Sequence, residues 1–351
     1  MTKNPYSMNF GQIPGEMVQR LRPMDEVMQA FVHDNPRQQV YMITGVRGSG
    51  KTVFLTEVEK RLQKEKNFII VDLNPEDDML SSLCAALKAK KSLLGIFESA
   101  GVSFSLAGIS ANIQGGHKES DVRPALEKML GALKKHGKRL LLAIDEVSNS
   151  AYMRIFISEF QQYLRKDFPV YLLMTGLYKN ISSLQNAKSL TFLYRAPKIM
   201  MDPLNIGAMA DNYSANLHVD SEQALFAAKL TSGYSFAFQV LGSLLFSNDC
   251  NIEKVIPEYR QYLEEYSYEK IWSELSQTDQ DVCAAVASLM NLSSDGVKIA
   301  EIRNKMDISS NLLNQYRTRL LRQEILLVPS YGSVQFALPL FREFVLSQIE
   351  V

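Results

Sequence analysis

The chain has 351 residues, which at about 150 residues per domain corresponds to two or three domains. Hydrophobic residues make up 46% and charged residues 22% of the sequence, which excludes a chain that is disordered, collagen-like or coiled-coil throughout. The 38 lysines and arginines balance the 38 aspartates and glutamates, so binding to nucleic acid or to an anionic membrane requires a local basic patch.

Cysteine and histidine are few and scattered. The three cysteines contain no C-x-x-C pair, so we expect neither a disulfide framework nor a cysteine-rich zinc site, and a reducing compartment fits best. The four histidines form no cluster that suggests a metal. The chain does not open with a basic segment and an apolar stretch, and no run approaches the roughly 18 apolar residues that cross a bilayer. We therefore expect a cytoplasmic protein with no membrane partner.

Helices and strands alternate over the N-terminal half. Helices are predicted over residues 16–32, 53–65, 76–91, 122–135 and 152–165, and strands over residues 39–44, 68–73, 139–144 and 170–175. The strands are almost continuous apolar runs, which is typical of a parallel sheet covered by helices on both faces. The predicted fold class of this half is α/β.

Residues 101–116 change to a period of two, with the pair Ala107-Gly108 in the middle. This period predicts a β-hairpin inserted into the α/β domain. The pattern favours a hairpin that covers a helix or a sheet edge over an arm that binds a partner, and both interpretations stay open.

The C-terminal half is predicted to be mainly helical. Helices are expected over residues 206–217, 221–231, 235–246, 252–276, 279–290, 298–306 and 309–322, followed by strands over 325–329 and 333–337 and a closing helix. Three helices followed by a two-stranded wing describe a winged helix. We therefore place an α/β domain at 1–203, a helical lid with its linker at 204–276 and a winged-helix domain at 277–351.

The strongest motif is GVRGSGKT at residues 45–52, which fits the pattern G-x-x-x-x-G-K-[ST] between a predicted strand and a predicted helix. Glycines let backbone N–H groups converge on phosphate oxygens, and the helix N-terminus adds partial positive charge. Lys51 would reach the β- and γ-phosphates, and the hydroxyl of Thr52 suits Mg²⁺. The residues predicted to contact the nucleotide are Gly45, Val46, Arg47, Gly48, Ser49, Gly50, Lys51, Thr52 and Val53.

Two acids end the apolar strand LLLAI. Because ligands of open α/β sheets bind at the carboxyl ends of the strands, Asp145 and Glu146 are expected at the site. Asp145 would hold the hydration shell of Mg²⁺, and Glu146 would polarise a water for in-line attack on the γ-phosphorus.

Three weaker candidates each have an ordinary structural alternative. Thr175 ends its strand where a hydroxyl can position the attacking water, or it is a turn residue. Asn74 would hydrogen-bond Glu146, or it belongs to a plain Asn-Pro turn. Arg195 would stabilise γ-phosphate charge within the chain or across a subunit boundary, or it is a solvated arginine.

These motifs, in this order, resemble an AAA+ P-loop ATPase of the archaeal-type ATPase and origin-recognition/cell-division-control initiator-like branch. GVRGSGKT corresponds to Walker A, LLLAIDE to Walker B, Thr175 to sensor 1 and the Arg195 segment to the arginine-finger box. The resemblance runs from about Phe10 to the C-terminus and implies a P-loop NTPase sheet, a helical lid and a winged helix. It also implies ATP with Mg²⁺ as the ligand, ATP hydrolysis as the activity, and a nucleotide-controlled switch or motor coupled to the winged helix.

One departure from this pattern concerns hydrolysis. Residues 233–238 carry no basic residue where initiators usually have the sensor-2 arginine of the lid. The chain is therefore also similar to the STAND NTPases, in which nucleotide acts chiefly as a slow switch. In that alternative the winged helix binds protein, and there is little hydrolysis or DNA binding.

The predicted helix over 309–322 is rich in asparagine and arginine, residue types that contact phosphates and base edges. Nearby Glu301, Asp307 and Glu324 dilute the positive charge. The partners expected from the sequence are ATP or ADP, double-stranded DNA through the winged helix, and a second copy of the chain or another protein.

Overall fold

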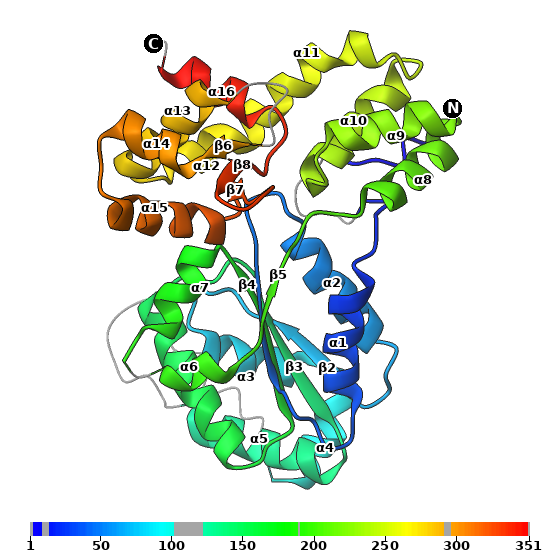
Figure 1. Cartoon of the computed structure of the whole chain (residues 1–351). Helices are drawn as coiled ribbons and strands as arrows, with labels where there is room; N and C mark the ends of the chain where they lie inside the picture. Colours follow the sequence, from blue (N-terminus) through cyan, green and yellow to red (C-terminus); the bar gives the residue numbers. More distant parts are fainter. Residues whose placement is uncertain (1–2, 9–13, 102–121, 189, 291–295, 350–351) are drawn as a thin grey trace, which may run out of the picture. The chain divides into compact units, whose positions relative to one another are not determined.

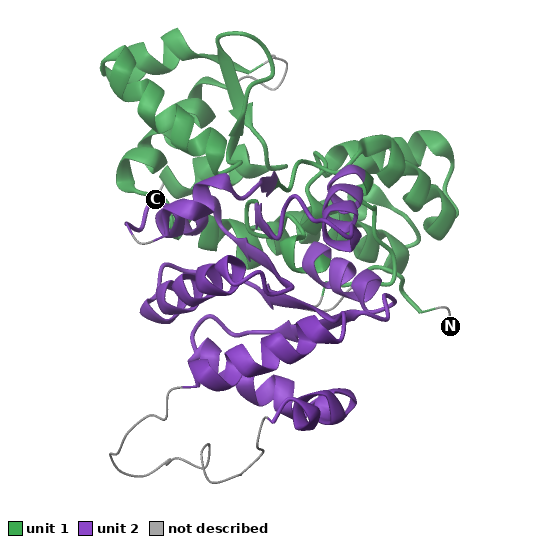
Figure 2. Ribbon diagram, turned by 90° about the horizontal axis from the view of Figure 1, so that it is seen from below, with its two compact units in different colours: residues 1–21, 45–53, 200–351 green, residues 22–44, 54–199 purple. Residues whose placement is uncertain are grey.

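The computed structural model describes residues 3–8, 14–101, 122–188, 190–290 and 296–349. Contacts between residues divide the chain into two compact units (Figure 2). The sheet unit comprises residues 22–44 and 54–199, and the loop unit comprises residues 1–21, 45–53 and 200–351. The predicted hairpin at 101–116 lies almost entirely outside the described residues. Among the helices described, none is both long and apolar enough to cross a membrane.

The sheet unit is built on a five-stranded sheet with the order β2-β3-β4-β1-β5 (Figure 1). Its strands are β1 (Val40–Thr44), β2 (Phe68–Asp72), β3 (Arg139–Ile144), β4 (Val170–Gly176) and β5 (Lys198–Met200). The pairs β2–β3, β3–β4 and β1–β4 are parallel. The prediction of an α/β fold with a parallel sheet is confirmed, and the apolar strands begin and end within one or two residues of the predicted bounds.

Successive side chains of a strand point to opposite faces of the sheet, so each face presents its own set of side chains for packing. Different helices cover the two faces. Met42 and Leu172 belong to the core that includes α3, α5, α6 and α7. On the other face, the ring of Phe31 of α1 packs edge-to-face on Tyr41 and Tyr171, with centroids 5.6 and 5.2 Å apart. The helices that lie wholly or mostly in this unit are α1 (Leu21–Val32), α2 (Lys51–Leu62), α3 (Met79–Ala89), η1 (Lys91–Leu93), α4 (Leu94–Ser99), α5 (Arg123–Lys135), α6 (Ala151–Arg165), α7 (Tyr178–Gln185) and η3 (Thr191–Arg195).

Two helices start later than predicted, and hydrogen bonds near their first residues explain why. The helix expected from residue 76 begins at Met79, because the carboxylate of Asp78 caps it and accepts from the N–H groups of Leu80 and Ser81. The helix expected from residue 16 begins at Leu21, since the carbonyl of Glu16 accepts a hydrogen bond from a distant side chain instead of a helical N–H.

The loop unit is largely helical. Its helices are α8 (Ile206–Leu217), α9 (Ser221–Leu230), α10 (Ser235–Ser247), α11 (Ile252–Leu263), the π-helical turn η4 (Glu264–Tyr268), α12 (Glu269–Ser273), α13 (Gln277–Leu289), α14 (Ile299–Met306), α15 (Ser310–Arg322) and α16 (Phe341–Ile349). A small antiparallel sheet has the order β6-β8-β7, formed by Val297–Lys298, Ser333–Phe336 and Leu326–Leu327. One continuous hydrophobic core joins these elements, and it contains Tyr213, Phe238, Tyr268 and Phe341.

The contacts do not follow the predicted division into three domains, which stays a prediction. Residues 45–53 and the first 21 residues pack with residues 200–351, although at least 147 positions (200 − 53) separate them in sequence. The two-residue strand β6 was not predicted, because Val297–Lys298 is too short to show a period of two.

Candidate functional site

The glycine loop, residues 45–50, connects the end of β1 to the first residue of α2. Gly48 and Gly50 have φ angles of +75° and +91°, which lie in the region that favours glycine. A Cβ atom on Gly48 would lie 2.3 Å from the Tyr234 hydroxyl oxygen. Both the backbone conformation and the close approach of Tyr234 therefore require glycine at position 48.

Lys51 is held over the loop by the loop itself. Its Nζ donates to the carbonyl oxygens of Gly45 at 3.0 Å and Val46 at 2.9 Å. These two contacts place a positive charge at the N-terminus of α2, where the helix dipole also favours an anion.

The start of α10 holds the loop through its carbonyls. The Tyr234 hydroxyl donates to the carbonyl of Arg47 at 2.6 Å, and the N–H of Phe236 donates to the carbonyl of Gly48 at 3.1 Å. Burial raises the pKa of Tyr234, and its hydroxyl also hydrogen-bonds Ser267. The segment that lacks a sensor-2 arginine thus contacts the glycine loop through other groups.

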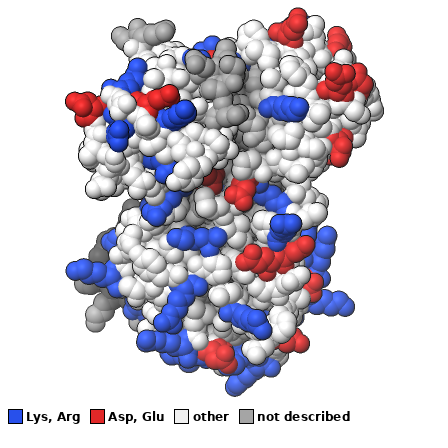
Figure 3. All heavy atoms as spheres, viewed as in Figure 1, with Lys and Arg blue, Asp and Glu red and all other residues white. Residues whose placement is uncertain are grey.

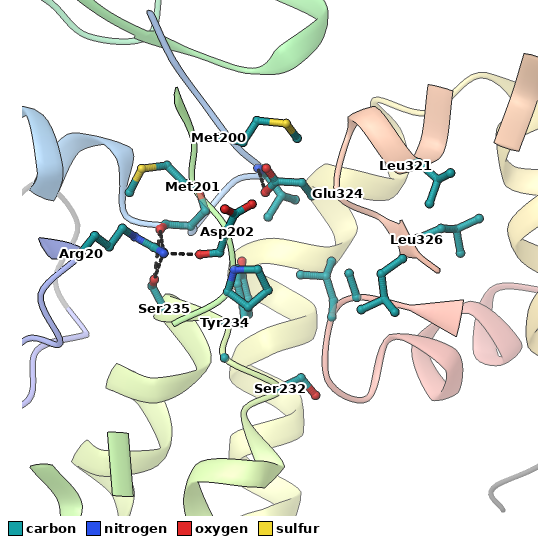
Figure 4. A pocket seen from close by; sticks show the side chains of 17 residues that line it. Arg20, Met200, Met201, Asp202, Ser232, Tyr234, Ser235, Leu321, Glu324 and Leu326 are labelled. Atoms are coloured by element: carbon teal, nitrogen blue, oxygen red, sulfur yellow. Dashed lines mark hydrogen bonds between the residues drawn. The ribbon is translucent and has the colours of Figure 1, made fainter. Parts of the chain in front are cut away.

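Arg20 adds a contact to the same side of the loop (Figure 4). Its guanidinium donates to the carbonyl of Ser49 at 3.0 Å, to the hydroxyl of Ser235 at 3.2 Å and to the carbonyl of Asp202. The Ser235 hydroxyl donates to the same Ser49 carbonyl at 3.0 Å. Burial lowers the pKa of Arg20 below its ordinary value. Sequence reasoning missed Arg20, because no motif links it to a loop 29 residues away.

Glu324, which follows α15, also contacts the loop. Its Oε2 accepts a hydrogen bond from the N–H of Val46 at 3.2 Å, and its Oε1 is buried with no hydrogen-bond partner among the described residues. Burial raises the pKa of Glu324 to about 7, although the Val46 N–H and the charge of Lys51 act in the opposite direction. The sequence suggested only that Glu324 reduces positive charge near α15.

A cavity of about 260 Å³ lies between these groups within the loop unit. Figure 4 shows Arg20 and Glu324 on its wall with the apolar side chains of Met201, Leu321 and Leu326. The cavity adjoins the glycine loop through Val46 and Ser49. Most of its wall is apolar, and its charged groups, Arg20, Asp202 and Glu324, come from three segments that are far apart in the sequence.

In the sheet unit, the structure brings three predicted site residues together. The N–H of Glu146 donates to Asp145 Oδ1 at 3.1 Å and to the hydroxyl oxygen of Thr175 at 3.2 Å, and that hydroxyl donates to Asp145 Oδ1. The side chain of Thr175 is fully buried, whereas Glu146 is exposed. The three residues lie at the carboxyl ends of the adjacent strands β3 and β4.

Glu146 has a φ angle of +54°, in the left-handed region. Such a conformation costs on the order of 1–3 kcal/mol for a residue other than glycine. The two hydrogen bonds to its N–H hold it in place. The chain therefore turns sharply after Asp145 and directs Glu146 away from the core of the sheet.

The strand register relates the glycine loop to this edge of the sheet. Ile43 pairs with Thr175, and Thr44 pairs with Gly176. The glycine loop leaves the sheet directly after Thr44, so it starts at the carboxyl edge at which Asp145 and Thr175 lie.

Glu59 of α2 is a further acid near this edge. Its side chain is 8% exposed, and burial raises its pKa to about 8, with added effects from a hydrogen bond to Asp72 and from the charges of Asp72 and Asp145. Sequence reasoning missed it. The available signal was a glutamate among the apolar residues Leu55, Val58 and Leu62 that form the buried face of the helix.

Two weaker candidates have different outcomes. Asn74 bonds within its own turn: its amide donates to Asp77, and its oxygen accepts from the N–H of Glu76. The interpretation of Asn74 as a partner of Glu146 is therefore not supported, and the turn alternative fits. Arg195 is exposed at the end of η3, and none of the described residues hydrogen-bonds or ion-pairs with it. Its role stays a prediction.

Two family models match parts of the chain. Residues 19–175 match an ATPase domain predominantly from Archaea. The expected resemblance to archaeal-type ATPases is confirmed over these residues, and the match supports an ATP-hydrolysing enzyme. Residues 265–345 match a domain of unknown function, DUF8462. Among the curated proteins, no sequence matches the chain.

Solved structures are similar over almost the whole chain. The Walker-type ATPase PABY2304 of Pyrococcus abyssi has a TM-score of 0.59 at 15% identity, and the match covers 94% of this chain and 96% of that one. Cdc6p from Pyrobaculum aerophilum has a TM-score of 0.46 at 13% identity, covering 98% and 97%. The Aeropyrum pernix Orc1 protein, in complex with DNA, has a TM-score of 0.44 at 13% identity, covering 96% and 94%. The first likeness supports the α/β fold, and the two lower scores add nothing to it.

Proposed function

Because residues 19–175 match an archaeal-type ATPase domain, we propose that the chain is a Mg²⁺-dependent AAA+-type ATPase that works as a nucleotide-controlled switch. The observation that carries this proposal is the way in which the carbonyls of the glycine loop are held. Three successive carbonyls, those of Arg47, Gly48 and Ser49, accept hydrogen bonds from Arg20 or from the start of α10.

Peptide geometry gives these contacts a consequence for anion binding. In a trans peptide the carbonyl of one residue and the N–H of the next point in opposite directions, and no described peptide bond is cis. The N–H groups of Gly48 and Gly50 therefore point away from the contacts with Tyr234 and Arg20. We infer that these N–H groups, with Lys51 and the helix N-terminus, bind the phosphates of ATP.

The oxygen atoms that the candidate site offers to a metal suit Mg²⁺ better than a metal that needs several protein ligands. Among the described residues, no group of three or more His, Cys, Asp or Glu side chains could hold a metal ion. Mg²⁺ is usually bound by one or two protein oxygens together with phosphate oxygens and waters. We propose that Thr52 and Asp145 supply the protein oxygens, and that bound Mg²⁺ would neutralise phosphate charge.

Glu146 is the proposed general base for hydrolysis. It is exposed, and its backbone is held by Asp145 and Thr175 in a conformation that needs support. Thr175 donates its single hydroxyl proton to Asp145, so its proposed contribution includes orienting this carboxylate as well as aligning water. Arg195 is proposed to approach the γ-phosphate within the chain or from a neighbouring subunit.

We propose that the C-terminal module, residues 277–351, is a winged helix that binds double-stranded DNA. Tyr331, between β7 and β8, is fully exposed, as expected for a wing tip. Arg319, however, pairs at 2.7 Å with Asp279, a carboxylate that is 3% exposed, so this arginine serves the packing of the module. Basic and acidic side chains are mixed on the upper part of the face seen in Figure 3.

A protein partner for the C-terminal module is the second candidate, as in a STAND-like switch with slow turnover. Two observations favour it: residues 233–238 have no basic residue, and Glu324 contacts the glycine loop. Filter binding of a DNA duplex at about 50 mM and 200 mM salt separates the candidates. A steep loss of affinity with salt supports DNA, whereas no retention at the lower salt supports a protein partner.

Mass spectrometry of the nucleotide that co-purifies with the chain tests the site itself. We expect ATP or ADP at close to one per chain. A purified chain that carries no nucleotide and binds none when Mg²⁺ and ATP are added contradicts the proposed function.

A further inference from the structure

Glu324 reaches the glycine loop because the chain turns sharply after α15. Glu324 has a φ angle of +58°, and the N–H of Ile325 bonds back to the carbonyl of Leu320 at 3.0 Å. Ile325 itself is buried. The backbone on either side of Glu324 is therefore fixed, and the side chain extends from the C-terminal module to Val46.

The surroundings of this carboxylate are electrostatically mixed. Lys51 and Arg20 favour its negative charge, whereas burial and the neighbouring charge of Asp202 oppose it. The contact with Val46 uses one carboxylate oxygen, and the other is buried with no partner among the described residues. A glutamine would satisfy the same N–H without burying a charge, so hydrogen bonding to Val46 alone does not explain an acid here.

We propose that Glu324 is an autoinhibitory latch that ties the C-terminal module to the glycine loop and is released when a nucleotide binds there. The inference rests on the proposed function, since it requires phosphates at the loop. The phosphate groups of a bound nucleotide bring several negative charges close to Lys51. These charges compete with the carboxylate of Glu324 for the positive charge of Lys51. The contact between Glu324 and Val46 is weakened as a result.

Linkage makes this effect reciprocal. If nucleotide weakens the hold of Glu324 on the loop, then Glu324 must weaken nucleotide binding by the same factor. Nucleotide occupancy is thereby coupled to the freedom of the C-terminal module, the part of the chain for which we propose a partner. In this proposal a single hydrogen bond, between Val46 and Glu324, couples the glycine loop to the C-terminal module.

Equilibrium binding of a fluorescent ATP analogue with Mg²⁺ tests the latch in the full-length chain. Glu324→Gln keeps a hydrogen-bond acceptor for Val46 and removes the charge. We expect it to bind the analogue about fivefold more tightly than the unmodified chain, within the usual range of such couplings. The gain should be largest for the ATP analogue, smaller for ADP and smallest for AMP, because the opposing charge falls in that order.

Glu301→Gln is the matched control, because Glu301 is an exposed acid on α14 of the same module. We expect it to bind as the unmodified chain does. Equal affinities for the unmodified chain, Glu324→Gln and Glu301→Gln overturn the latch and leave the proposed function intact. If neither the unmodified chain nor Glu324→Gln binds nucleotide, the proposed function fails and the latch fails with it.

Hydrogen exchange of the unmodified chain provides a test that does not depend on a variant. We expect the amides of residues 323–327 to exchange faster when a non-hydrolysable ATP analogue and Mg²⁺ are bound. Exchange that is unchanged or slower in this segment, with the analogue bound, contradicts the latch.

Discussion

The glycine loop and the acidic edge of the sheet are held in different ways. The acids are fixed by close neighbours on adjacent strands, since Asp145, Glu146 and Thr175 bond to one another. The loop is held by groups far away in the sequence, such as Tyr234, 187 residues away from Arg47, and Glu324, 278 residues away from Val46. The sheet therefore fixes the acids that are proposed to perform chemistry, whereas the loop is linked to the parts of the chain that would respond to nucleotide.

The largest expected effect concerns the acidic edge. If Glu146 is the base, Glu146→Gln should lower ATP turnover by about 100-fold or more, because a positioned base contributes roughly that factor. Binding of ATP should stay within about twofold, so the variant traps ATP. Steady-state phosphate release and nucleotide binding measure the two quantities. Glu98→Gln, at an exposed position on α4, is the control, and unchanged turnover in Glu146→Gln would exclude Glu146 as the base.

Replacing glycine with alanine tests how closely the loop is packed. Gly48 and Gly332 have similar φ angles, +75° and +77°, but a Cβ would contact Tyr234 only at position 48 and would meet nothing within 4 Å at position 332. Gly332→Ala thus reports backbone strain alone, about 1 kcal/mol, while Gly48→Ala adds a steric clash and should cost about 1–3 kcal/mol more. Urea unfolding measures both free energies. Equal costs would show that Tyr234 does not constrain the loop.

The acidic edge should also show a dependence on pH through Glu59. Its pKa is raised in the folded chain to about 8 from an ordinary value of 4.5. The folded state therefore holds a proton that the unfolded state releases, and the free energy of unfolding falls as the pH rises from about 4.5 to about 8. Glu59→Gln should remove at least about 1 kcal/mol of this decline, as measured by urea unfolding across that range. If the free energy of unfolding falls equally with pH in the unmodified chain and in Glu59→Gln, Glu59 is not the cause of the decline.

The smallest effect is expected for one contact of the loop. Tyr234→Phe removes the hydroxyl that donates to the Arg47 carbonyl and should lower the free energy of unfolding by about 1 kcal/mol and nucleotide affinity a few-fold. Tyr331→Phe, at a fully exposed position, serves as the control. If Tyr234→Phe binds nucleotide as well as Tyr331→Phe does, the hydroxyl of Tyr234 does not help to shape the loop.

The sequence predicted well those features that depend on neighbouring residues. The apolar runs predicted the strands β1 to β4 to within one or two residues of their observed bounds. The motif GVRGSGKT placed the glycine loop between β1 and α2. The acids were expected at the carboxyl edge of the sheet because parallel strands end there together, and the structure places Asp145 and Glu146 beside Thr175.

Features that depend on long-range packing were not predicted. Arg20 and Glu324 contact the loop only because separate segments fold together, and neither belongs to a local pattern. The short elements α4 and β6 were also missed, since six and two residues are too few to show a period. Glu59 carried a weak signal, an acid on an apolar helix face, that becomes meaningful only when Asp72 is seen beside it.

Calorimetric titration of the full-length chain with Mg²⁺ and ATP, compared with Lys51→Ala, tests the central claim most directly. Lys60→Ala, an exposed lysine further along α2, is the matched control. We expect one ATP per chain for the unmodified protein and for Lys60→Ala, and at least about 100-fold weaker binding for Lys51→Ala, because the lysine held over the loop would lose its contact with the phosphates. Equal binding by Lys51→Ala and Lys60→Ala would contradict a phosphate site at the glycine loop.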